Sequence, residues 1–300
     1  MEESWLNDIA AAYGLGEVLG HRRMGGTNDN YAITTPSGAY LCKIIVNMPI
    51  DDILAGLPFL RRLEEYGFSE AVFYLRTPDG RTALQTPDYA AVVLPFLEGT
   101  RPVPSVEVSR QVGAELARMH RVPADGLPDK RHWNDSLYLP ETLAVALARH
   151  GADSMRETLR VVDELRLFDP GAFPQVIIHG DMDTSNSLMT EDGIRFLDWQ
   201  DIAVGAAIMD IAGAVLGFCF DPDFQPALFE ALATGYGDLS AFEAGHLLDA
   251  MRYAAITQSI WLMSVWDQYR AGEPMVETSL LYWEYGMDRL RLPEWPRLAR

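Results

Sequence analysis

The sequence predicts an α+β fold in two parts, a small sheet-forming region followed by a larger, mostly helical one. Three observations lead to this prediction. Short apolar segments of strand length, separated by turn residues, occupy most of the first 94 residues. From residue 99 onward most apolar residues recur at the helical spacing, and near the middle of the chain two short apolar strands enclose a polar loop. We therefore expect domains at residues 1–96 and 97–300.

The first domain is expected to consist of strands and one helix. Its strands are predicted at about residues 17–23, 30–35, 39–46, 70–76 and 89–94, and its helix near residues 53–66. Pro36-Ser-Gly38 and Pro78-Asp-Gly80 have the composition of tight turns between strands. The third strand contains Lys43 among apolar residues, where a cation is costly without an anionic partner.

The second domain is expected to be mostly helical. Val108, Val112, Leu116 and Met119 share one face of a predicted helix. Further helical patterns cover about residues 141–150, 154–168, 208–219, 241–270 and 276–290.

The two apolar strands near the middle of the chain enclose the most informative motif. Residues 176–178 run into a polar loop with Asp181 and Asn186, and a second apolar segment ends at Asp198. Glu191-Asp-Gly193 predicts a hairpin turn within this stretch. The layout is typical of a phosphoryl-transfer site, because Asp181 can accept the proton of an attacking hydroxyl. Asn186 and Asp198 offer the hard oxygen ligands that Mg²⁺ prefers.

The motif His179-Gly-Asp181, followed by Asn186 and then Asp198, resembles the catalytic signature of the aminoglycoside phosphotransferase and choline kinase family. These are small-molecule kinases with a two-lobed protein-kinase-like fold, in which a small antiparallel-sheet N-lobe precedes a mostly helical C-lobe. The resemblance implies ATP and Mg²⁺ as cofactors and a small-molecule alcohol as substrate. It implies catalysis by Asp181, metal binding by Asn186 and Asp198, and structural support by His179 and Asp210.

The resemblance also implies where the nucleotide binds. Residues 24–30 are similar to the glycine loop of choline and homoserine kinases, which places Gly25, Gly26, Thr27 and Asn28 near the phosphates. Glycines there let the backbone approach a ligand closely. Lys43 is expected to hold the ATP phosphates, and the backbone from Leu94 to Phe96 is expected to contact the adenine edge.

One departure from the family pattern concerns the partner of Lys43. Many members have a glutamate on the helix of the small lobe, where this chain has Gly56-Leu-Pro-Phe59. Asp51, Asp52 and Glu64 are the alternative partners, and the sequence does not choose among them.

The second departure is Asp183, which either binds a substrate amine or is a solvated loop residue. The sequence leaves both interpretations open. Other substrate contacts are expected from the helical domain, where aromatic faces can hold ammonium groups. The full set of substrate candidates is Asp183, Asp201, Trp261, Trp266, Tyr282 and Trp283. Core packing is the alternative for each aromatic residue.

Several functions fit this pattern. Within the family the chain most resembles type II homoserine kinases, through Phe96-Leu-Glu-Gly99, residues 113–120 and Phe218-Cys-Phe220. Choline or ethanolamine kinase is the second interpretation, and aminoglycoside O-phosphotransferase the third. A catalytically silent binding protein on the same fold is a further alternative, because the helix glutamate is missing. Asp181-Met-Asp183 also resembles the nucleophile loop of haloacid-dehalogenase phosphatases, but the helical pattern that follows disfavours that fold.

Composition and charge restrict the possible partners. The net charge of −19 at pH 7 disfavours a nucleic-acid partner, which needs a basic surface, and weakly favours cationic substrates. No apolar run is as long as a membrane span, and the acidic N-terminus lacks the features of a signal peptide. We therefore expect a cytoplasmic kinase of a small amino alcohol, with no membrane partner.

Overall fold

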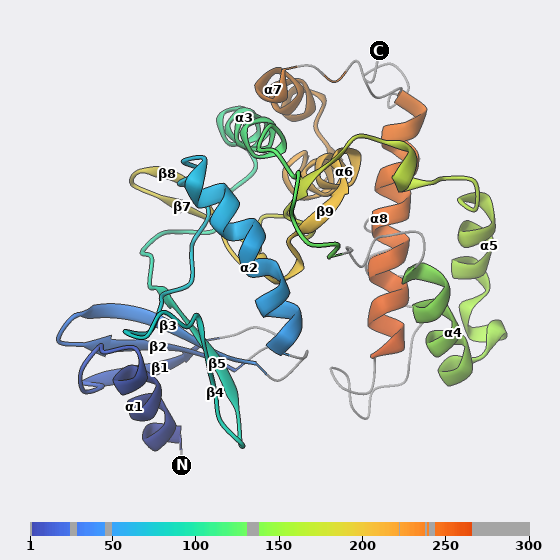
Figure 1. The fold of residues 1–300 in the computed structure, drawn as a ribbon. Helices are drawn as coiled ribbons and strands as arrows, with labels where there is room; N and C mark the ends of the chain where they lie inside the picture. The colour runs from blue at the N-terminus through green and yellow to red at the C-terminus, as the bar shows by residue number, and fades with distance from the viewer. Residues whose placement is uncertain are drawn as a thin grey trace. The chain divides into compact units, whose positions relative to one another are not determined.

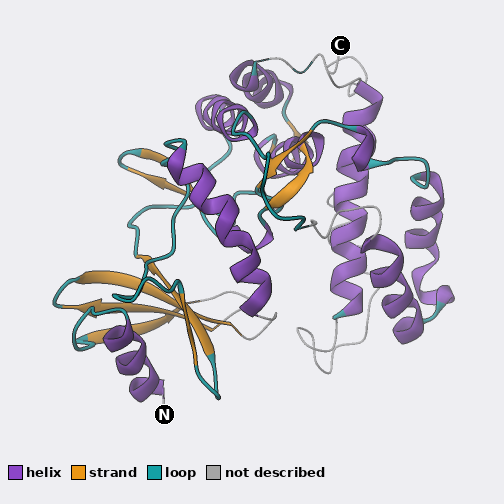
Figure 2. Cartoon of the chain, viewed as in Figure 1, coloured by secondary structure: helices purple, strands orange, loops and turns teal. Residues whose placement is uncertain are grey.

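The computed structural model describes residues 2–24, 29–45, 50–130, 138–221, 223–237, 239 and 244–265. The chain divides into two compact units. The sheet unit comprises Met1–Thr100 and Leu188–Gln200, and the helical unit comprises Arg101–Ser187 and Asp201–Arg300. An antiparallel sheet dominates the first unit and helices dominate the described part of the second, which confirms the α+β class (Figure 2).

Among the described residues, five antiparallel strands form the sheet of the sheet unit, in the order β1-β2-β3-β5-β4 (Figure 1). They are β1 (Gly20–Met24), β2 (Asp29–Thr35), β3 (Gly38–Ile45), β4 (Ala83–Gln85) and β5 (Ala90–Pro95). The strand predicted at residues 70–76 is wrong, and β4 was not predicted. Ala71 forms an isolated bridge to Phe196, and Leu75 donates a hydrogen bond to Val93. Residues 83–85 of β4 pair instead with residues 90–92 of β5.

Helices cover both faces of this sheet. α1 (Glu2–Ala12) buries Leu6 against one face, and α2 (Ile50–Glu65) buries Ile53 against the other. α1 was not predicted from the sequence, whereas α2 confirms the helix expected near residues 53–66. Because side chains alternate along a strand, Lys43 of β3 lies on the same face as Ile45, which packs with Ile53 of α2.

A hairpin from the middle of the chain belongs to the sheet unit. It consists of β7 (Ser187–Thr190) and β8 (Gly193–Phe196), as the Asp-Gly turn predicts. Each strand forms an isolated bridge to the first hundred residues, Met189 to Thr100 and Phe196 to Ala71. The hairpin therefore brings Asp198 into the same unit as Lys43.

The helical unit contains most of the helices (Figures 1 and 2). They are α3 (Val106–His120), α4 (Tyr138–His150), α5 (Arg156–Glu164), α6 (Ala207–Phe218), α7 (Pro226–Tyr236) and α8 (Ala244–Ser264), with short 3-10 turns η1 (Ala152–Met155) and η2 (Pro170–Ala172). All except α7 correspond to predicted helical patterns. The pattern predicted at residues 276–290 lies outside the described residues.

Packing in the helical unit centres on α8, which contacts α4, α5 and α6, while α3 packs against α7 (Figure 1). β6 (Gln175–Ile178) pairs antiparallel with β9 (Ala203–Ala206), and β10 (Phe220–Asp221) pairs with β11 (Asp223–Phe224). Within the described ranges, no helix combines the length and the apolarity needed to cross a membrane.

Candidate active site

The polar loop that follows β6 closes on itself through Asn186. The side-chain amide nitrogen of Asn186 donates to Oδ2 of Asp181 at 2.7 Å and to the backbone carbonyl of Asp181 at 2.9 Å. Because the nitrogen is committed to Asp181, the amide oxygen of Asn186 is the atom left to bind another group. The same contacts fix the orientation of the Asp181 carboxylate, as a catalytic base requires.

Asp183 shapes the same loop. Its Oδ1 accepts hydrogen bonds from the backbone nitrogen of Ser185 at 2.6 Å, from the Ser185 hydroxyl at 2.5 Å and from the backbone nitrogen of Asn186 at 3.0 Å. A carboxylate that accepts from the backbone two residues later forms an Asx turn. These contacts favour the loop interpretation of Asp183, and its role as a substrate ligand stays a prediction.

Two glycines of α6 let this loop lie directly on the helix. A Cβ atom on Gly217 would lie 2.8 Å from Cα of Asp183, and one on Gly213 would lie 3.2 Å from the carbonyl oxygen of Met182. The first distance is shorter than a Cβ atom tolerates against backbone. The loop position therefore requires glycine at residue 217.

Buried Asp210 of α6 anchors the start of the loop. Its carboxylate accepts hydrogen bonds from the backbone nitrogens of His179 at 2.7 Å and Gly180 at 2.8 Å. Nε2 of His120 lies 3.4 Å from Oδ2 of Asp210, and Nδ1 of His120 lies 2.9 Å from the Tyr236 hydroxyl. Burial raises the pKa of Asp210, but the hydrogen bond and charge of His120, with smaller contributions from His179 and Gly180, hold that pKa below its ordinary value.

In the sheet unit, Lys43 has a partner that the sequence did not identify. Nζ of Lys43 lies 2.5 Å from Oδ1 of Asp198 and 3.1 Å from Oε1 of Gln200. The three partners considered from sequence are elsewhere: Asp51 and Asp52 lie exposed in the first turn of α2, and Glu64 pairs with Arg76 at 3.6 Å. The metal-ligand candidate Asp198 thus takes the place of the missing helix glutamate.

The backbone at Asp198 is unusual. Its φ is +56°. Among the described residues, every other residue with a positive φ is a glycine. Such a conformation costs roughly 1–3 kcal/mol in a residue other than glycine, and residues held in it cluster at functional sites. Trp199, buried in the 3-10 turn η3 (Trp199–Asp201), holds the chain after Asp198 because its indole nitrogen donates to the Phe196 carbonyl at 2.9 Å.

The other predicted site residues are only partly described. Leu94 lies buried in β5, and the backbone nitrogen of Phe96 donates to the Ala39 carbonyl at 3.1 Å, so that amide is engaged within the sheet. Asp201 and Trp261 are half-buried, in η3 and in α8. Seven candidates lie outside the described residues: Gly25, Gly26, Thr27, Asn28, Trp266, Tyr282 and Trp283.

A model of the phosphotransferase enzyme family (APH) matches residues 21–248. The chain belongs to this family. The matched residues run from β1 to α8 and include Lys43, the loop with Asp181 and Asn186, and Asp198. The family resemblance of the sequence motif is therefore confirmed over most of the chain.

The phosphotransferase is similar to the homoserine kinase of Methylobacterium radiotolerans, with 27% identity over 261 residues that cover 82% of this chain and 80% of the relative. Among solved structures, amicoumacin kinase hAmiN in complex with AMP-PNP, Ca²⁺ and Ami matches with a TM-score of 0.75 at 16% identity, over 96% of this chain and 93% of that one. Choline kinase LicA from Streptococcus pneumoniae matches with a TM-score of 0.69 at 16% identity, over 96% and 98%.

These similarities confirm the protein-kinase-like fold. Together with the family, they identify the protein as an ATP-dependent small-molecule kinase. The phosphotransferase also has polar residues near its candidate groups that sequence reasoning missed. Gln200 contacts Lys43, His120 contacts Asp210, and Gln258 of α8 contacts Asp181. Two of them had a signal in the sequence: Gln200 lies two residues after Asp198, and His120 ends the segment 113–120 that resembles homoserine kinases. Gln258 belongs to none of the motifs.

Proposed function

We propose that this kinase transfers the γ-phosphoryl group of Mg²⁺–ATP to the hydroxyl of a small amino alcohol, with homoserine as the leading substrate. The observation that carries the proposal is the fixed arrangement of Asp181 and Asn186, in which the amide nitrogen of Asn186 is committed to Asp181. That arrangement presents a carboxylate to the alcohol and an amide oxygen to a metal, as the transfer requires.

Asp181 is proposed as the catalytic base. One carboxylate oxygen, Oδ2, accepts a hydrogen bond from Asn186, so the carboxylate keeps a defined plane. A carboxylate oxygen has a second lone pair, which allows it to accept the proton of the attacking hydroxyl. Orientation of the hydroxyl and proton acceptance typically contribute about 10²–10⁴ to the rate.

Asn186 and Asp198 are proposed as the metal ligands. Mg²⁺ is usually held by one or two protein carboxylates or amides together with substrate phosphates and water. The donor set fits: one oxygen of Asp198 accepts from Lys43, and the other accepts no hydrogen bond from the described residues. When bound, Mg²⁺ would neutralise charge on the transferring phosphoryl group. Lys43 would hold the nucleotide phosphates, exchanging its carboxylate partner for phosphate oxygens.

The amino group of the substrate is proposed from three observations of different kinds. The relative described above is a homoserine kinase, and one structural neighbour is a choline kinase. The net charge of −19 weakly favours the approach of a cation. Asp201 and Trp261 are half-buried groups of the helical unit with the chemistry to bind an ammonium group. Choline, ethanolamine and an aminoglycoside are the other candidates.

A substrate panel tests the proposal. ADP release would be measured with Mg²⁺–ATP and, separately, homoserine, threonine, choline, ethanolamine, methylthioribose and an aminoglycoside. We expect homoserine to be phosphorylated far faster than 4-hydroxybutanoate, the matched compound without the amine. We also expect EDTA to abolish turnover and added Mg²⁺ to restore it. A neutral sugar as the best substrate, or no ADP release above background with any amino alcohol, would contradict the proposal.

A further inference from the structure

One polar side chain of α8 faces the catalytic loop, residues 179–186, which contains Asp181 and Asn186. The amide nitrogen of Gln258 lies 3.5 Å from Oδ1 of Asp181, the carboxylate oxygen that Asn186 does not hold. We propose that Gln258 is a positioning residue, which holds Asp181 in the orientation needed to receive the substrate hydroxyl. This inference rests on the proposed kinase function, and it names a residue outside the sequence motif.

The chemistry of the contact fixes which way the Gln258 amide points. A carboxylate only accepts hydrogen bonds, so the group that faces Asp181 must be the amide nitrogen and not the amide oxygen. Asp181 is then bracketed by two amide donors, Asn186 at Oδ2 and Gln258 at Oδ1. The contact at 3.5 Å is long, and a movement of about half an ångström would bring it to the ordinary distance of ~2.9 Å.

The neighbouring polar residues of α8 do not share this direction. The Thr257 hydroxyl donates to the Tyr253 carbonyl at 2.9 Å, and the Ser259 hydroxyl donates to the Ala255 carbonyl at 2.9 Å. Both hydroxyls are therefore satisfied within their own helix, as is common for serine and threonine inside helices. The amide of Gln258, in contrast, reaches across to another segment, and that segment is the catalytic loop.

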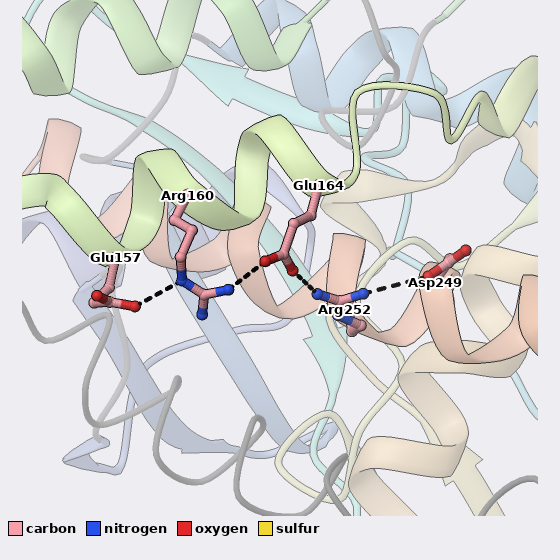
Figure 3. Close-up of polar contacts among 5 residues, drawn as sticks. All are labelled: Glu157, Arg160, Glu164, Asp249 and Arg252. Carbon is pink, nitrogen blue, oxygen red and sulfur yellow. Dashed lines mark hydrogen bonds and ion pairs between the residues drawn. The ribbon is translucent and has the colours of Figure 1, made fainter.

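The helix that carries Gln258 is held on both sides of this residue. Before it, Arg252 forms an ion pair with Glu164 of α5 and lies 3.6 Å from Asp249, while Arg160 joins Glu164 to Glu157 (Figure 3). After it, Nε2 of His150 on α4 lies 2.7 Å from the Met263 carbonyl. The backbone position from which the Gln258 side chain extends is therefore nearly fixed, as the positioning of Asp181 requires.

A double-mutant cycle tests the proposal. Gln258→Leu keeps the size of the side chain and removes the donor, so we expect kcat with the best alcohol to fall on the order of 10-fold, while the KM for ATP changes by less than about twofold. In the Asp181→Asn background the same substitution is expected to change the residual kcat by less than about twofold, since the group that it positions is gone. A merely structural role would lower kcat equally in both backgrounds.

Two further variants keep the test decisive. Gln258→Glu retains size and polarity, and its negative charge facing Asp181 is expected to lower kcat more than Gln258→Leu does. Gln225→Leu is the matched control, because the amide of Gln225 makes a similar contact, 3.4 Å to the Asp221 carbonyl, at the start of α7. It should leave kcat unchanged. Unfolding curves of all variants would show that each folds.

The outcomes separate the two proposals. A wild-type protein inactive toward the whole panel overturns the kinase substrate proposal and this inference with it. An active wild type whose kcat is unchanged by Gln258→Leu, or is lowered equally in the Asp181→Asn background, overturns the role of Gln258 alone. Loss of kcat in Gln258→Leu that disappears in the Asp181→Asn background supports it.

Discussion

Lys43 and Asp198 form a direct ion pair, with Nζ of the lysine 2.5 Å from Oδ1 of the aspartate, although the residues are 155 positions apart in the chain. The lysine side chain is 8% exposed and the aspartate side chain 32% exposed. A buried ammonium group is costly without an anion, and here the anion is also the proposed metal ligand. The pairing with Lys43 and the proposed metal binding thus depend on the same carboxylate.

Replacing Asp198 should therefore affect both folding and nucleotide binding. Asp198→Ala leaves Lys43 without its carboxylate, which is expected to cost about 1–3 kcal/mol of unfolding free energy and to weaken Mg²⁺–ATP binding strongly. Urea unfolding and calorimetric titration would measure the two effects. Glu64→Gln is the control, because the pair of Glu64 with Arg76 is exposed and worth little. Equal effects of the two substitutions would contradict the assignment.

Asp181→Asn tests the catalytic base. The amide has the same shape as the carboxylate but cannot accept a proton, so kcat should fall by about 10²–10⁴ while ATP affinity is retained. Initial rates and nucleotide titration on one preparation would check this. Asp163→Asn, at an exposed position on α5, should behave as the wild type. Near-normal turnover by Asp181→Asn would exclude Asp181 as the base.

Gly217→Ala tests how the catalytic loop is seated on α6. A Cβ atom at this position would come within 2.8 Å of Cα of Asp183, so the loop or the helix must move. Displacement of a catalytic group by about 1 Å can cost about 10²-fold in rate, and we expect a loss of that order. Gly245→Ala on α8 is the matched control, since nothing lies within 4 Å of the added atom. If both variants retain full kcat, the close approach has no functional importance.

Asp183 has two interpretations that one pair of variants can separate. Asp183→Asn removes the charge but keeps an oxygen that can accept from the Ser185 and Asn186 backbone. If Asp183 shapes the loop, this variant keeps its KM for the amino alcohol within about twofold, and Asp183→Ala lowers kcat. We expect this result. A large increase of KM in Asp183→Asn, confined to substrates with an amine, would instead identify Asp183 as a substrate ligand.

The buried Asp210 carboxylate predicts a pH dependence of stability. Its pKa in the folded protein lies below the ordinary value of 3.8, so the charged form is favoured by folding. The resulting stabilisation is complete above the unfolded-state pKa and is lost as the pH falls through the lower, folded-state value. Asp210→Asn should therefore destabilise the protein more at pH 7 than at about pH 3. Urea unfolding at both pH values would measure this, and an equal cost at both would refute it.

Local patterns in the sequence determined the strands β1 to β3 and β5, most of the helices, the β7–β8 hairpin and the loop with Asp181 and Asn186. These features could be predicted because each depends on periodicity, turn residues or motif spacing within a short segment. The family membership followed from the same short motifs, and the match over residues 21–248 confirmed it.

Tertiary structure alone decided the contacts between distant segments. From the sequence, the candidate partners of Lys43 were Asp51, Asp52 and Glu64. Its pairing with Asp198 instead depends on the bridges that join residues 188–200 to the first hundred residues within the sheet unit. The contact of Gln258 with Asp181 likewise depends on how α8 packs, and no spacing in the sequence encodes it. The physical reason is that a polar side chain takes the partner that packing places beside it, while sequence patterns report only neighbours along the chain.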